Sequence, residues 1–239
     1  MAIIYDSLQF VTFTTRPPIR TAVELWQSEF GKMPDSFQQL PMGAGSQAVG
    51  SIGGLQFIVI VQLNRIDVVI RPPENLPNNL GTVSQPNSAM AKGISVLKKL
   101  SAGEHILRPA VVFQTSEEFP DLGGSVAKAV SLLPGQVVVP QATIDVSFHT
   151  NVPRTSLVDP NVTIQRMYRV ANGRRVAVQV DLANPGNMLQ HLGAYIATQY
   201  VDVFAAPETP MRAQDFDEVL DEIVKEAQLI LSDGYDHFS

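Results

Sequence analysis

The sequence predicts an α+β fold, built from two successive β-α-βββ-α units with antiparallel sheet and helices packed on one face. Three observations lead to this prediction. Hydrophobic residues make up 45% of the 239 residues, which is enough apolar material for a sizeable core. Short segments that alternate polar and apolar residues occur in groups of three, separated by turn residues. A helical pattern precedes and follows each group.

The first unit is expected over residues 1–103. Its elements are a strand at 8–15, a helix from about Ile19 to Phe30, three strands at 46–52, 55–62 and 66–70, and a helix at 88–100. Two prolines end the first strand and Gly31 ends the first helix, since glycine is common just beyond a helix. Residues 71–86 carry four prolines and three asparagines, which is typical of a linker.

The second unit is expected over residues 104–239 and repeats this order with one additional helix. We expect a strand at 108–115, a helix at 117–133, strands at 142–150, 162–170 and 175–182, and helices at 187–204 and 213–231. The Asn172-Gly173 pair predicts a tight hairpin between the last two strands. The two units either arise from a duplication and form one pseudo-symmetric domain, or their similar order is accidental.

The element order is similar to the saddle-like arrangement of the TATA-binding-protein and helix-grip superfolds. The resemblance lies in the order of elements alone, so it implies no function.

The formal net charge of −6 is unevenly placed. Nine of the 23 acidic residues and two of the 17 basic residues fall in 208–239, which leaves a body of 15 basic and 14 acidic residues. A nearly neutral body does not favour non-specific nucleic-acid binding. The acidic face of the last helix is either a solvated surface or a docking surface for a basic partner.

The chain has no cysteine, which excludes a disulfide scaffold and a thiolate-ligated metal. The longest apolar run, at 57–61, is far below the roughly 20 residues that a membrane helix needs. The first residues carry no basic start and no long apolar segment, so we expect no secretory signal and a cytoplasmic protein.

The strand at 55–62 is apolar on both faces. One face consists of alternate residues from Leu55 to Val61, and the other is expected to form an interface through four residues: Gln56, Ile58, Ile60 and Gln62. This second face is covered either by the other half of the chain or by a partner, a second subunit or a ligand. Asp67, isolated on the next strand, is expected to pair with Arg65 or Arg71.

One basic concentration surrounds the predicted hairpin. Its candidate ligand-binding residues are Arg166, Tyr168, Arg169 and Arg175. A sheet that carries arginines and a tyrosine can bind an anionic ligand or a single nucleic-acid strand, although few aromatic residues interleave here. The alternative is a solvated hairpin tip with cross-strand ion pairs.

The sequence contains no pattern that predicts catalysis. The four histidines are not spaced as metal ligands, and the glycine-rich segments lack the lysine and helix of a phosphate-binding loop. A metal site would need Asp145, His149 and Asp181 from neighbouring strands. We therefore expect no catalytic residue, no metal and no cofactor, and we lean away from an enzyme.

Several short stretches resemble a sporadically distributed, uncharacterised prokaryotic family of about 250 residues. They are 15–19 (TRPPI), 146–151 (VSFHTN), 166–170 (RMYRV), 180–182 (VDL) and the amphipathic helix at 216–231. The resemblance implies no catalytic residue. It implies a role in accessory, conflict or defence gene clusters, which favours partner binding.

Three functions follow as expectations. The first is a non-enzymatic interaction or assembly module in a homo-oligomer or multi-protein complex. The second is a binding protein for a small anionic ligand or nucleotide on the sheet surface, through Arg169 and Arg175. The third, least favoured, is a metal-dependent hydrolase or nuclease.

Overall fold

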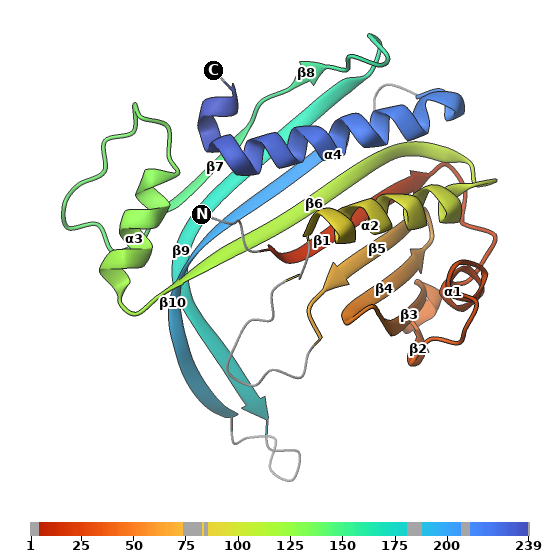
Figure 1. The fold of residues 1–239 in the computed structure, drawn as a ribbon, viewed down its shortest axis with the longest axis horizontal. Coiled ribbons are helices and arrows are strands. Elements are labelled where there is room, and N and C mark those ends of the chain that lie inside the picture. Colours follow the sequence, from red (N-terminus) through yellow and green to blue (C-terminus); the bar gives the residue numbers. More distant parts are fainter. Residues whose placement is uncertain (1–4, 74–82, 84–85, 181–187, 207–210, 239) are drawn as a thin grey trace.

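The protein contains one large antiparallel sheet and four α-helices in a computed structural model that describes residues 5–73, 83, 86–180, 188–206 and 211–238 (Figure 1). The strands are β1 Tyr5–Thr14, β2 Ser36–Gln39, β3 Gly45–Ile52, β4 Leu55–Gln62, β5 Arg65–Arg71, β6 Ile106–Phe119, β7 Ser147–Asn151, β8 Arg154–Thr155, β9 Thr163–Val180 and β10 Met188–Ala205. The helices are α1 Ala22–Phe30, α2 Pro86–Ser101, α3 Leu122–Ser131 and α4 Phe216–Asp233, with short 3-10 turns at Pro41–Gly43, Ala213–Asp215 and Gly234–Phe238. The fold is therefore α+β, as the sequence predicts.

The strand order is β2-β3-β4-β5-β1-β6-β10-β9-β7, with β8 paired to β9. The first strands of the two expected units, β1 and β6, lie side by side and antiparallel at the centre of the sheet. The expected units 1–103 and 104–239 thus contribute to one continuous sheet, and their boundary falls between α2 and β6.

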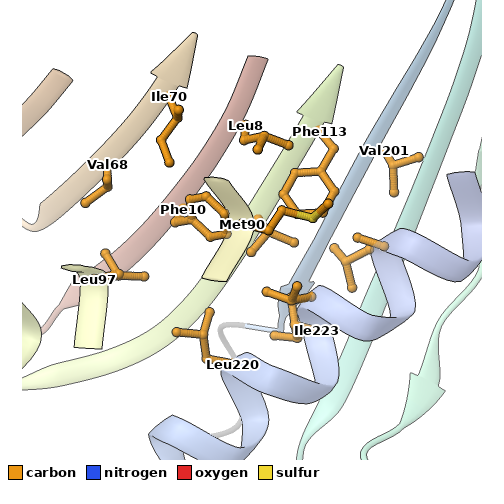
Figure 2. Packing of buried hydrophobic residues seen from close by; sticks show 14 of the residues in the cluster. Leu8, Phe10, Val68, Ile70, Met90, Leu97, Phe113, Val201, Leu220 and Ile223 are labelled. Carbon is orange, nitrogen blue, oxygen red and sulfur yellow. The ribbon is translucent and has the colours of Figure 1, made fainter. Parts of the chain in front are cut away.

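All four α-helices pack on the same face of the sheet (Figure 1). Figure 2 shows side chains of α2 and α4 pointing toward the central strands, where they meet Phe10 of β1 and Phe113 of β6. Gly93 lets α2 approach β1 closely, because a Cβ atom at this position would collide with the Phe10 ring. No helix in the described part of the chain is long and apolar enough to span a membrane.

The elements of the first unit follow the sequence closely. Helix α1 begins at a capping box, in which the side chains of Thr21 and Glu24 each accept a hydrogen bond from the other residue's backbone N–H, and it ends at Gly31 with φ of 65°. Strand β4 has the predicted bounds. Strand β2 lies in a segment that was expected to be a loop, and most of the predicted linker 71–86 lies outside the described residues.

The second unit departs from the prediction at Asn172-Gly173. These residues do not form a hairpin; they continue β9, which pairs with β10 on one side and with β7 on the other. The Asn172 side chain accepts a hydrogen bond from Val146 N at 2.6 Å and donates one to Ile144 O at 3.2 Å. These bonds tie Asn172 to the segment before β7, and the described parts of the predicted strands 162–170 and 175–182 belong to one strand, β9.

The predicted helix at 187–204 was also wrong, since its described residues, 188–204, belong to strand β10. Its buried side chains recur at every second residue, at Ala197, Gln199, Val201 and Val203, which is the period of a strand. The predicted helix at 117–133 is shorter: β6 extends to Phe119 and α3 begins after the N-cap Asp121. The predicted strand at 142–150 is confined to β7.

Candidate functional site

The sheet face opposite the helices, called the open face below, carries the most developed candidate site. Among the described residues no helix packs against it (Figure 1). A hollow of about 330 Å³ lies at its centre, lined by side chains of β1, β5, β6, β9 and β10. The register explains why the hollow is here: Val11 lies beside Ala110 in the middle of the sheet, and larger side chains stand on both sides of this pair.

Arg65 and Asp67 form an ion pair on the β5 side of the hollow. Asp67 is only 2% exposed, and both of its carboxylate oxygens accept hydrogen bonds from Arg65, from Nε at 2.8 Å and from Nη2 at 2.6 Å. Gln9 Nε2 donates a third hydrogen bond at 2.7 Å. The expected pairing of Asp67 is thereby confirmed, with Arg65 as its partner. The ion pair and the hydrogen bonds offset the cost of burying the carboxylate charge.

Arg108 of β6 lies on the other side of Phe13 from β5 and is held by two aromatic rings. Its guanidinium carbon lies 4.2 Å from the ring centroid of Phe13 and 5.2 Å from that of Phe204. Nη1 also donates a hydrogen bond to Ala205 O at 3.1 Å. Stacking and hydrogen bonding together fix the position of this cation at the wall of the hollow.

Asp202 of β10 is the least compensated acid of the hollow. Within the described part of the chain no residue donates a hydrogen bond to its carboxylate or forms an ion pair with it. Burial raises the pKa of Asp202 to about 6, although the positive charges of Arg108 and Arg65 act in the opposite direction. A desolvated carboxylate without a donor is unfavourable in itself, so its presence in a hollow is typical of a binding position.

The sequence analysis did not identify the residues of this hollow, apart from the Arg65–Asp67 pair. Asp202 and Phe204 were not predicted because their segment was interpreted as a helix. Residues two apart in the sequence lie on the same face of a strand but on different sides of a helix. The available signal was the alternation of Val201 and Val203 with polar or aromatic neighbours.

The predicted interface residues of β4 lie on the open face. Ile58 is 7% exposed, Gln56 and Ile60 are half-buried and Gln62 is exposed. Their neighbours on the adjacent strands are Val49 of β3 and Val69 of β5. Leu55 and the three alternate residues that follow it face the helices, as predicted.

The four predicted ligand-binding residues do not come together. Arg166 and Tyr168 point to the helix-covered face and are 9% and 0% exposed. Arg169 is directed to the open face, where it lies opposite His149 of β7. Arg175 belongs to β9, but its side chain is outside the described residues. Arg166 and Tyr168 therefore do not share a surface with Arg169, because adjacent strand residues point to opposite faces.

Arg166 instead belongs to a buried ionic cluster beneath α4. Glu226 of α4 lies 2.8 Å from Arg154 Nη2, 2.9 Å from Arg166 Nη1 and 2.9 Å from His237 Nε2. Burial alone would raise the pKa of Glu226, but the hydrogen bonds from these three residues outweigh it and hold the pKa at about 2. Glu222 shares the guanidinium of Arg154 at 2.6 Å.

This cluster changes the interpretation of the acidic helix. Glu222 and Glu226 are compensated within the chain, and Asp221 pairs with Lys98 of α2 at 2.9 Å. Asp217 and Glu218 are exposed at the first turn. The acidic surface offered to a basic partner is therefore smaller than the sequence indicates.

The residues of the metal hypothesis are dispersed. Asp145 and His149 are exposed, and Asp181 lies outside the described residues. Among the described residues, no three histidine, aspartate or glutamate side chains lie close enough together to hold a metal ion.

Comparisons of the chain with family models, with curated proteins and with solved structures find no match.

Proposed function

We propose that this protein is a non-enzymatic binding module that works through the open face of its sheet, in a homo-oligomer or a larger cytoplasmic complex. The observation that carries this proposal is an apolar strip on the open face at one end of the sheet. The strip consists of Val49, Ile58, Ile60 and Val69, which are neighbours on β3, β4 and β5. No helix of the described chain lies over these side chains.

The partner that fits this strip best is a second copy of the chain. The open-face positions of β3 and β4 carry glutamine, serine and aliphatic residues and no charge. A neutral apolar strip with glutamines at its rim is self-complementary, so two copies can stack without bringing like charges together.

Light scattering coupled to size-exclusion chromatography tests this proposal on the full chain. We expect a mass of twice the 26.0 kDa chain, and we expect Ile60→Lys to return it to a single chain. The matched control is Leu157→Lys, at a residue that is 87% exposed and distant from the strip. A wild-type protein that stays a single chain at high concentration would refute self-association, as would an Ile60→Lys variant that keeps the doubled mass.

A second function, the binding of a small ligand, is favoured by the hollow. Two guanidiniums fixed by stacking and ion pairing, an uncompensated carboxylate and several apolar side chains converge there. A concave site with few fixed polar groups is the usual arrangement of a small-molecule site. This site differs from the predicted anion site, since its arginines are Arg65 and Arg108 in place of Arg169 and Arg175.

We further infer that the two units derive from a duplication. The strand order supports it, because β3-β4-β5-β1 on one side of the centre corresponds to β7-β9-β10-β6 on the other. In each half the first strand is followed by a helix and pairs with the last strand of its own meander. A matching arrangement of contacts in separately expressed halves, measured by amide hydrogen exchange, would test the inference.

A further inference from the structure

Among the described residues, the hollow presents charged groups of both signs, and this restricts what it can bind. The charged side chains that line the hollow are Arg65, Arg108 and Asp202, and Asp67 lies next to them as the ion-pair partner of Arg65. Asp67 is already compensated by Arg65 and Gln9. Asp202 accepts no hydrogen bond from the described residues, and Nη1 of Arg65 donates none within them.

Ligands with a single charge fit this arrangement poorly. An anion that approaches the guanidiniums also meets the Asp202 carboxylate, whose repulsion is strong in a partly desolvated site. A cation that approaches Asp202 meets Arg65 and Arg108, both of which act on that carboxylate electrostatically. A ligand that carries one positive and one negative group avoids both conflicts.

The apolar lining and the volume of the hollow restrict the size and polarity of the uncharged part of a ligand. Val11, Ala110 and Val112 form a floor of small apolar side chains, and Met167 and Tyr200 stand beside Asp202. The volume of about 330 Å³ is near the lower limit for small-molecule sites, which favours a compact ligand with an apolar body.

We propose that the hollow binds a small zwitterion of the amino-acid class, with its ammonium group donating to Asp202 and its carboxylate accepting from Arg65 beside the Arg108 guanidinium. The apolar body of the ligand lies on the floor of Val11 and its two neighbours. This inference rests on the second proposed function, ligand binding in the hollow, and is independent of self-association through β4.

Calorimetric titration of the full chain tests the proposal. The probes are L-phenylalanine and L-leucine, each with two analogues of the same body that lack one charge: the carboxylic acid without the amine, and the amine without the carboxylate. We expect at least one amino acid to bind, and each of its single-charge analogues to bind about tenfold more weakly or worse, since one charge-assisted hydrogen bond is lost.

The variant Asp202→Asn separates recognition from folding. We expect it to fold, because it removes an uncompensated charge, and to weaken amino-acid binding about tenfold while leaving the binding of the carboxylic acid unchanged or stronger. Asp145→Asn removes an exposed acid away from the hollow and should change neither.

Three other outcomes would refute the zwitterion proposal, the role of the arginines, or ligand binding in the hollow. If the carboxylic acid binds as tightly as the amino acid, the hollow is an anion site and the zwitterion proposal fails while ligand binding stands. If the amine without a carboxylate binds as tightly as the amino acid, the proposed role of Arg65 and Arg108 in binding the ligand carboxylate is refuted. If no probe produces heat at millimolar concentration, and none shifts the melting temperature, ligand binding in the hollow fails as well.

Discussion

The ionic cluster beneath α4 allows a quantitative prediction about Glu226. In this cluster the Glu226 carboxylate accepts hydrogen bonds from Arg154 and Arg166, and His237 Nε2 lies 2.9 Å from the same oxygen that Arg166 contacts. Replacing Glu226 with glutamine keeps the size of the side chain and removes the charge. Arg154 retains Glu222 as a partner, but Arg166, which is 9% exposed, loses its carboxylate. A buried guanidinium without a counter-charge is strongly unfavourable.

The magnitude follows from the pKa of Glu226. A value of about 2 in place of the ordinary 4.5 corresponds to about 3 kcal/mol, since one pH unit is worth about 1.4 kcal/mol. Because the folded-state pKa lies below the unfolded one, this contribution is complete above about pH 4.5 and is lost as the pH falls toward 2. We therefore expect Glu226→Gln to lower the free energy of unfolding by about 3 kcal/mol at pH 7, and by progressively less below pH 4.5.

Urea unfolding at a series of pH values measures this effect, with the fluorescence of Trp26 as the probe, since it is the single tryptophan and is fully buried. Glu218→Gln removes the same charge from an exposed position of the same helix, and it should change stability by less than about 0.5 kcal/mol. A deficit of less than about 1 kcal/mol for Glu226→Gln at pH 7 would refute the reasoning, and so would a deficit independent of pH.

Two further predictions concern packing and the hollow. Gly93→Ala would place a methyl group against the Phe10 ring and should lower the free energy of unfolding by about 1–3 kcal/mol in urea titrations. The control Gly173→Ala should cause no such loss, because its added methyl group meets no atom within 4 Å. Equal losses in the two variants would contradict the close approach of α2 to β1. Burial raises the pKa of Asp202, so the wild-type protein loses stability as the pH rises from about 4 to 6. Asp202→Asn should therefore be more stable than wild type by roughly 1–2 kcal/mol at pH 7 and similar to it at pH 4 in thermal melts. A stability gain of the same size at both pH values would argue against an uncompensated carboxylate.

Local signals in the first half of the chain were sufficient to predict its elements apart from β2. Gly31 adopts the left-handed conformation expected beyond a helix, and β4 extends over the eight residues whose two apolar faces were recognised. The pairing of Asp67 was also predictable, because an acid isolated on a buried strand needs a neighbouring base. In each case the relevant partner lies within a few residues along the chain.

The second half contains the two errors that matter for function. Asn172-Gly173 has the sequence of a tight turn, but the Asn172 side chain bonds to the segment before β7, 26 residues away. Residues 187–204 contain alanine, leucine and glutamine, which suit a helix, yet from residue 188 onward they form β10, which pairs with β9 and, from Tyr195 to Phe204, also with β6. In both cases long-range pairing overrides the local preference.

The sequence by itself determined the α+β class, the two apolar faces of β4, the ion pair of Asp67, and the amphipathic α4 with its terminal glycine. These features depend on the period of the apolar residues and on local turn chemistry, which are properties of neighbouring residues. The tertiary structure decided that β1 and β6 pair at the centre of one sheet, that Glu226 binds Arg154 and Arg166, and that Asp202 faces Arg65 and Arg108 across a hollow. These groups are far apart along the chain, and only the pairing of strands and the packing of α4 bring their charges together.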